Sequence, residues 1–290
     1  MSTTASMRTL TLQLDSGPLV ADLHEGCGSS APPVLLIHGW GGSGRYWRGT
    51  VERLRERFDF IVPDLPGVGR SMPVSRPLDM FALTTAIETL LERIGATRVH
   101  VVGHSMGAGL AMLLAAGRPD LVDRVALTAI SLFRSESERV FFRNLTEVMG
   151  LAMRLRASWM ADLPFLTRQF ATRFFYRVPS DGTVLREGFL DYLAMDHGTA
   201  VASARSAASP DIAAAARRIQ APTLVIAARQ DKVMPVANIP FTVEAIPGSR
   251  LRWIDRCGHM PMVEQPDEFA AILGEFLMEK SVVSSQIRKN

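Results

Sequence analysis

Short runs of consecutive apolar residues recur along the chain, and segments with helical spacing separate them. A strand that is apolar at every position is buried on both faces, as in a parallel sheet. Two earlier runs alternate between apolar and polar residues, which indicates an antiparallel pair joined at Gly17 and Pro18. Strands are therefore expected at residues 8–14, 19–24, 34–38, 58–63, 99–103, 125–130, 223–228 and 250–255, with helices at 47–58, 80–94 and 105–116. This alternation predicts an α/β fold with a doubly wound, mostly parallel sheet.

The interval from 135 to 206 breaks this rhythm, because it contains helical segments but no strand-like run. We expect a helical cap here, inserted between the sixth and seventh strands. The predicted domains are a core over residues 1–134 and 207–282, the cap over 135–206 and a polar tail over 283–290. The cap is rich in Phe and Met side chains, which either pack it onto the core or line an apolar pocket. The sequence leaves both roles open.

Charge and composition exclude several classes of partner. The 290 residues carry 32 Lys and Arg against 29 Asp and Glu, a net charge of +3, and the basic residues are scattered among acidic ones. No dense basic block is present, so no nucleic acid is expected. Cys27 and Cys257 show neither metal-ligand spacing nor a disulfide framework, and no apolar run is long enough to span a bilayer. The sequence also opens without an apolar signal core, so we expect a cytoplasmic protein. We further expect no bound metal, and either a monomer or a homodimer.

The strongest chemical signal is the GHSMG sequence at residues 103–107, which follows an expected strand and opens an expected helix. This context is that of a nucleophile elbow, a sharp turn that presents a serine hydroxyl above the sheet. Gly103 and Gly107 remove the side chains that would clash in such a turn. Ser105 is therefore the expected nucleophile. The backbone N–H of Met106, at a helix N-terminus, is placed to stabilise negative charge.

A serine nucleophile needs a base and an orienting carboxylate, and in such a sheet the acid and then the histidine follow the serine. Of the six histidines, only His259 lies after the apolar run at 223–228, just beyond the last expected strand. Asp231 follows the same run directly, which makes it the expected acid. Asp255 competes, but its position at the end of the last strand suits a structural carboxylate better. The predicted catalytic residues are thus Ser105, Asp231 and His259.

A glycine-rich loop (HGWGGS) at residues 38–43 follows the strand at 34–38. Glycine allows a backbone to approach a substrate oxygen closely. The backbone N–H of Trp40 is therefore expected to form an oxyanion hole together with that of Met106. A phosphate-binding loop is the rival interpretation, but the Gly-Lys-Ser/Thr ending that such a loop requires is absent.

Two polar residues near these motifs are expected to serve the structure only. Asp64 should hold the loop that runs to Ser71 through hydrogen bonds to backbone N–H groups. His104 adjoins Ser105 in sequence, but we expect it to point away from the nucleophile and to pack, without acting as a second base.

Taken together, these motifs resemble those of the α/β-hydrolase superfamily in order and spacing. The match comprises HG at 38–39, DLPGVGRS at 64–71, GHSMG at 103–107, Asp231 and CGH at 257–259. The resemblance implies an eight-stranded, mostly parallel sheet with a helical cap, a Ser–Asp–His triad and no cofactor. The chain looks like the capped branch that holds esterases, lipases and carbon–carbon hydrolases. It departs from the family at Ala228, where glycine is common before the acid loop.

Residue identities separate the related chemistries. Haloalkane dehalogenases and epoxide hydrolases use an aspartate where this chain has Ser105. Ring-cleavage carbon–carbon hydrolases usually carry Asn and Trp where this chain has His104 and Met260, so that branch is disfavoured. The apolar cap favours a small hydrophobic acyl substrate, and we expect cleavage of an ester, thioester or lactone through an acyl-enzyme. Carbon–carbon hydrolysis, perhydrolysis, acyl transfer and slow-turnover ligand reception on the same triad remain alternatives.

Overall fold

The computed structural model describes residues 6–26 and 31–279. Cys27 and the predicted tail at 283–290 lie outside the described residues, as do small parts of the predicted core. Within the described part of the chain, no helix has both the length and the apolar character needed to cross a membrane.

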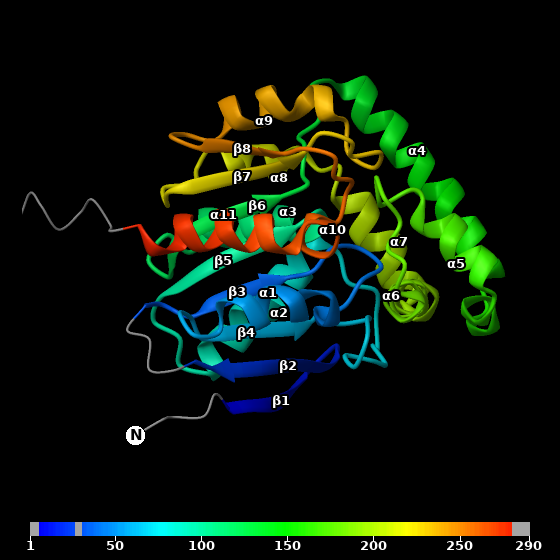
Figure 1. The fold of residues 1–290 in the computed structure, drawn as a ribbon, viewed down its shortest axis with the longest axis horizontal. Helices are drawn as coiled ribbons and strands as arrows, with labels where there is room; N and C mark the ends of the chain where they lie inside the picture. Colours follow the sequence, from blue (N-terminus) through cyan, green and yellow to red (C-terminus); the bar gives the residue numbers. More distant parts are fainter. Residues whose placement is uncertain (1–5, 27–30, 280–290) are drawn as a thin grey trace, which may run out of the picture.

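Eight strands form one sheet in the order β1-β2-β4-β3-β5-β6-β7-β8 (Figure 1). They are β1 (Ser6–Leu14), β2 (Gly17–Glu25), β3 (Val34–Ile37), β4 (Phe60–Asp64), β5 (Val99–His104), β6 (Val122–Thr128), β7 (Thr223–Ala228) and β8 (Arg250–Ile254). Strand β2 runs antiparallel to β1 and β4, whereas the remaining pairs are parallel. The eight-stranded, mostly parallel α/β fold that the sequence predicts is confirmed.

Helices cover both faces of this sheet. They are α1 (Arg48–Leu54), α2 (Met80–Arg93), α3 (Met106–Gly117), α8 (Pro210–Ala216), α9 (Ile239–Ala245), α10 (Pro261–Glu264) and α11 (Pro266–Met278), with short 3₁₀ turns η1 (Gly44–Trp47) and η4 (Val236–Asn238). In β3, Leu35 and Ile37 join the buried cluster beneath α2, α3 and α8, whereas Val34 and Leu36 join the cluster beneath α1 and α11. A strand covered on both sides must be apolar at every position, which explains its continuous apolar sequence.

Some boundaries differ from the expected ones. The helix expected at 47–58 is divided between η1 and α1 and ends at residue 54, while Phe58 is buried just before β4 begins. Strand β6 starts at Val122, three residues earlier than expected. Asp123 and Arg124 interrupt its apolar pattern although both side chains are buried and lie 3.8 Å apart as an ion pair.

Between β6 and β7 the chain is helical throughout its regular structure. The elements that precede α8 are α4 (Glu136–Ala152), η2 (Met153–Leu155), η3 (Ser158–Asp162), α5 (Pro164–Ala171), α6 (Gly182–Ala194) and α7 (His197–Ser206). Figure 1 shows these helices together beyond one end of the sheet, next to α10. Helix α7 packs against α4 and also against α2, which covers the sheet, so α7 connects α4 to the sheet layers. We propose residues 135–206 as a cap domain, and we call α4 to α7 with η2 and η3 the cap segment.

Candidate active site

Ser105 occupies a strained turn between β5 and α3. Its backbone angles are φ 54° and ψ −119°, in a region that residues with a side chain rarely adopt. A Cβ atom added to Gly103 would lie 2.3 Å from the carbonyl oxygen of Gly107, and one added to Gly107 would lie 2.4 Å from that of Ile37. Both positions therefore require glycine, which explains the spacing of the motif around Ser105.

Asp231 and His259, which come from separate loops after β7 and β8, lie in direct contact. The Nδ1 atom of His259 is 2.8 Å from Oδ2 of Asp231, and both side chains are buried. The other carboxylate oxygen accepts hydrogen bonds from the backbone N–H groups of Val233 (2.7 Å) and Met234 (3.0 Å). Burial alone raises the pKa of Asp231, but His259 and these two N–H groups outweigh it and hold the pKa below its usual value. Asp231 is thus an oriented, ionised partner for His259.

The alternative acid lies elsewhere. The Asp255 side chain is 81% exposed and forms an ion pair with Arg229 at 3.4 Å. Its carboxylate therefore faces solvent and a surface arginine, whereas that of Asp231 contacts His259. Of the two acids that the sequence left in competition, the structure brings Asp231 to the histidine.

The glycine-rich loop after β3 lies directly against Ser105. A Cβ atom on Gly39 would be 3.2 Å from Cβ of Ser105, so the backbone at this point approaches the serine closely. Trp40 follows Gly39, and its indole N–H donates a hydrogen bond to the carbonyl of Ala200 in α7 (2.9 Å). Met106 is the first residue of α3, so its backbone N–H has no partner within the helix. Trp40 and Met106 line the same cavity as Ser105.

A chain of hydrogen bonds joins the glycine-rich loop to the histidine loop. The N–H of Gly39 donates to Oη of Tyr46 (2.5 Å), Oη lies 2.9 Å from Nδ1 of His104, and Nε2 of His104 lies 2.8 Å from the carbonyl oxygen of His259. Burial, reinforced by the neighbouring His259, lowers the pKa of His104 to about 3, and burial raises the pKa of Tyr46. The imidazole is therefore neutral and the phenol protonated. The Tyr46 hydroxyl donates to Nδ1, and Nε2–H donates to the His259 carbonyl.

Through these contacts His104 links two loops by hydrogen bonds, whereas the sequence led us to expect only a packing role. Its ring centroid lies 4.8 Å from that of His259, and both of its nitrogens are hydrogen-bonded. Tyr46 was not singled out by any sequence motif, because a lone tyrosine in a short 3₁₀ turn has no pattern that separates it from a packing residue. Only the fold brings it to His104.

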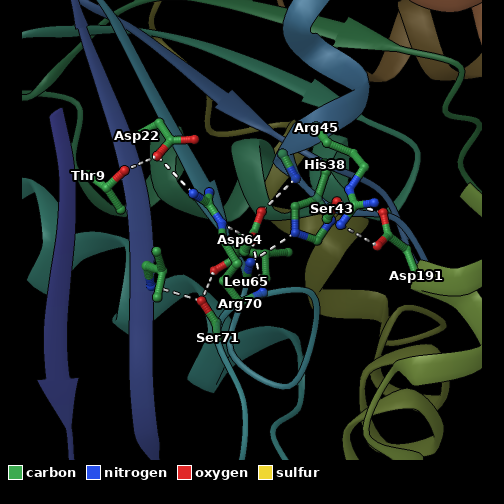
Figure 2. Close-up of polar contacts among 12 residues, drawn as sticks. Thr9, Asp22, His38, Ser43, Arg45, Asp64, Leu65, Arg70, Ser71 and Asp191 are labelled. Carbon is green, nitrogen blue, oxygen red and sulfur yellow. Dashed lines mark hydrogen bonds and ion pairs between the residues drawn. The ribbon is translucent and has the colours of Figure 1, made fainter. Parts of the chain in front are cut away.

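A second polar network joins the core to the cap segment (Figure 2). The Asp64 carboxylate accepts hydrogen bonds from the backbone N–H of Gly44 (2.8 Å) and from the backbone and side chain of Arg70 (3.0 and 2.8 Å). Its carbonyl oxygen accepts one from the hydroxyl of Ser71 (2.6 Å). The expected anchoring role of Asp64 is thereby confirmed.

The same network reaches α6 through the turn after the glycine-rich loop. The hydroxyl of Ser43 donates to Oδ2 of Asp191 (2.6 Å), and the guanidinium of Arg45 lies 3.5 Å from Oδ1 (Figure 2). Burial raises the pKa of Asp191 to about 6, even though Ser43 and Arg45 oppose the shift. Asp191 is therefore an acid with a raised pKa, buried between the core and the cap segment. The sequence contains no motif that marks it.

Ser105 and His259 open onto a cavity of about 750 Å³ between the core and the cap segment. Apolar side chains from both sides form most of its wall, including Leu132, Phe142, Met149, Phe170 and Phe174. Some Phe and Met side chains of the cap segment thus line the cavity, whereas Met153 is not part of its wall and packs in a buried cluster with Val68, Met195 and Ala200. Within residues 6–26 and 31–279, no group of three or more His, Cys, Asp or Glu side chains is placed to hold a metal ion.

Comparison with known proteins shows that the chain is similar to hydrolases. Residues 32–266 match the family model described as alpha/beta hydrolase fold. The chain is 30% identical to a putative carbamate hydrolase RutD of Pseudomonas savastanoi pv. phaseolicola, covering 88% of this chain and 97% of the relative. It is 26% identical to a pimeloyl-[acyl-carrier protein] methyl ester esterase of Nitrosomonas europaea, covering 87% and 98%. The crystal structure of an enol-lactonase from Burkholderia xenovorans LB400 superimposes with a TM-score of 0.77 at 22% identity, covering 93% and 100%.

Proposed function

The chain belongs to the α/β-hydrolase fold family, and on this premise we propose that it is a serine hydrolase of hydrophobic carboxylic esters, thioesters or lactones. One observation carries the proposal. The buried Asp231–His259 pair, joined at 2.8 Å, opens onto the same cavity as Ser105, whose backbone is strained. A base held by a carboxylate beside a serine in such a turn is the arrangement that activates a hydroxyl for acyl transfer.

The proposed reaction passes through an acyl-enzyme. His259 removes the hydroxyl proton of Ser105 as Oγ attacks the carbonyl carbon, and the ionised Asp231 stabilises the imidazolium that forms. The backbone N–H groups of Trp40 and Met106 stabilise the oxyanion. The imidazolium then protonates the leaving alkoxide or thiolate as the carbon–oxygen or carbon–sulfur bond breaks. Water, activated by His259, attacks the acyl-enzyme and releases the acid.

The cavity supports an apolar acyl group. Its volume of about 750 Å³ lies within the range of pockets that enclose small organic ligands. Its wall is mainly aliphatic and aromatic, so transfer of a hydrocarbon chain from water into it is favourable. The relatives named above act, by their names, on a carbamate, a methyl ester and an enol-lactone. These substrates share an acyl carbon attacked by a nucleophile, which supports the same class here.

The test is hydrolysis of p-nitrophenyl esters from acetate to dodecanoate by the wild type and by Ser105→Ala. We expect turnover by the wild type and a loss of several orders of magnitude in the variant. Ser131→Ala is the matched control, because Ser131 also lines the cavity but its hydroxyl contacts the sulfur of Met234. Mass spectrometry of wild type quenched during turnover should find the acyl group on the peptide that contains Ser105.

The competing chemistries predict other results. If the folded wild type hydrolyses none of the esters faster than Ser105→Ala does, the esterase proposal is wrong. Carbon–carbon hydrolysis or a role as a ligand-binding receptor is then favoured instead. Stoichiometric release of p-nitrophenol followed by tight product binding indicates a receptor. Preferential transfer of the acyl group to hydrogen peroxide or an added alcohol indicates a perhydrolase or an acyltransferase.

A further inference from the structure

Helix α4 of the cap segment turns its apolar side outward. Its buried residues are Thr146 and Gly150, and a Cβ atom on Gly150 would lie 2.8 Å from the side chain of Val201 in α7. Phe141, Leu145 and Val148 follow one another at spacings of four and three residues on another side of the helix, and they are 71%, 41% and 66% exposed. An amphipathic helix of a folded domain normally buries its apolar stripe. The stripe of α4 faces solvent instead.

The exposed apolar surface continues beyond α4. Leu151 near the end of α4 and Leu155 in η2 extend the stripe, and Trp159 of η3 and Phe165 of α5 add two aromatic side chains. Each of these four residues is more than half exposed. We call this set the cap patch: Phe141, Leu145, Val148, Leu151, Leu155, Trp159 and Phe165. Figure 1 shows α4 and α5 along the outer edge of the cap segment, away from the sheet. Exposed apolar surfaces of this extent mark sites of interaction with another surface.

The charges around the cap patch are mainly positive. Residues 136–177 contain seven arginines and four acidic residues and therefore carry a net charge of +3. Glu136 is paired with Arg139 and Arg143, and Glu147 with Arg205. Asp162 is already paired with Arg186 of α6. The exposed arginines of this stretch that have no acidic partner among the described residues are Arg154, Arg168, Arg173 and Arg177.

From this combination we infer that the cap patch binds an anionic lipid surface. Apolar side chains enter the boundary between headgroups and acyl chains, while arginines beside them bind anionic headgroups. A second copy of the chain fits the patch less well. A two-fold contact through it would bring the four arginines of each copy near those of the other, and like charges would repel.

The position of the cap patch relates binding to the proposed function. Phe141 and Leu145 belong to the cap patch and also line the cavity that contains Ser105. The patch therefore borders the cavity, so a lipid surface bound there lies beside the route by which an apolar acyl substrate enters. The binding claim does not depend on catalysis, whereas the claim about substrate entry rests on the proposed function.

Flotation with vesicles tests the binding. Vesicles of ether-linked phosphatidylcholine, with and without ether-linked phosphatidylglycerol, contain no acyl ester, so hydrolysis cannot alter them. We expect the wild type to float with the anionic vesicles, to bind neutral ones far less, and to be released by salt. Arg154→Gln/Arg168→Gln should weaken the partition coefficient by roughly fivefold for each charge removed. Val148→Ser/Leu155→Ser should weaken it by about tenfold or more.

The matched control is Arg55→Gln/Arg93→Gln, which removes two exposed arginines from the core and should leave binding unchanged. None of these variants alters a cavity residue, so all should hydrolyse a water-soluble ester at the wild-type rate, and an unchanged circular dichroism spectrum verifies folding without reference to activity. Equal binding to neutral and anionic vesicles, or no binding to either, overturns the inference. A dimer in sedimentation that Val148→Ser/Leu155→Ser dissociates assigns the patch to a second copy instead. Because binding is read without turnover, it can fail while the Ser105 experiment succeeds, and the reverse.

Discussion

The Oη atom of Tyr46 lies 2.9 Å from Nδ1 of His104, and this contact connects the two loops on either side of Ser105. The phenol accepts the N–H of Gly39 from the glycine-rich loop, and His104 bonds the carbonyl of His259. Because the imidazole of His104 is neutral and the phenol of Tyr46 is protonated, each of these three hydrogen bonds has a fixed donor and a fixed acceptor. The proposed oxyanion donor next to Gly39 and the proposed base are thereby held in one network.

Removing the Tyr46 hydroxyl should therefore impair the rate more than substrate binding. Tyr46→Phe leaves the Gly39 N–H and Nδ1 of His104 without partners in a buried site, which costs about 1–3 kcal/mol of stability for each such group. We expect kcat on a p-nitrophenyl ester to fall about tenfold while KM changes little, because a misplaced oxyanion donor acts on the transition state. Tyr176→Phe is the control, since the Tyr176 side chain is 42% exposed. A rise in KM at unchanged kcat would show that Tyr46 serves substrate binding instead.

Replacing the two candidate acids separates their roles. Asp231→Asn should reduce kcat by about 10⁴, because an amide no longer holds His259 in the required tautomer or stabilises the imidazolium. Asp255→Asn should leave kcat within about twofold, since removing an exposed surface ion pair has little effect. Steady-state kinetics over the same series of ester concentrations measures kcat for both variants. Comparable losses in the two variants would contradict the assignment of Asp231.

The glycine requirement around Ser105 predicts a stability difference between two helical glycines. A Cβ atom at position 107 would lie 2.4 and 2.5 Å from the backbone oxygens of Ile37 and His38. Gly107→Ala should therefore lower the free energy of unfolding by about 3 kcal/mol or more. Gly188→Ala, in α6 with no atom within 4 Å of the new methyl group, should raise it by about 0.5–1 kcal/mol. Urea unfolding followed by circular dichroism measures both, and a neutral Gly107→Ala would disprove the close packing at this turn.

The buried acid between core and cap segment predicts a pH-dependent stability. Burial raises the pKa of Asp191 to about 6, above its value in the unfolded chain, so the folded state favours the protonated form. The stabilisation is complete below the unfolded pKa of about 3.9 and is lost as the pH rises through about 6. Asp191→Asn stays neutral, so relative to it the wild type should lose about 2 kcal/mol between pH 4 and pH 7.5. Thermal melts across this range measure the difference. A stability difference between the wild type and Asp191→Asn that does not change with pH would exclude Asp191 as the titrating group.

The sequence by itself determined the order of strands and helices and the turn around Ser105. These features depend on local patterns, since continuous apolar runs specify doubly covered strands and two glycines specify a turn that no other residue fits. The order of serine, acid and histidine is likewise a property of the chain. The expected start of β6 was wrong because the charged Asp123 and Arg124 are buried in the strand, paired with Arg98 and Glu279, which lie far away in sequence.

Tertiary structure alone decided which side chains meet. Asp231 and Asp255 both follow strands, and only the paths of their loops bring one of them to His259 and leave the other in solvent. Tyr46 reaches His104 across 58 residues, a contact that no periodicity encodes. The outward apolar face of α4 is also invisible in sequence, because an amphipathic pattern predicts a helix but not the direction in which packing turns it. Local chemistry specifies the backbone, whereas contacts between distant segments depend on how the whole chain packs.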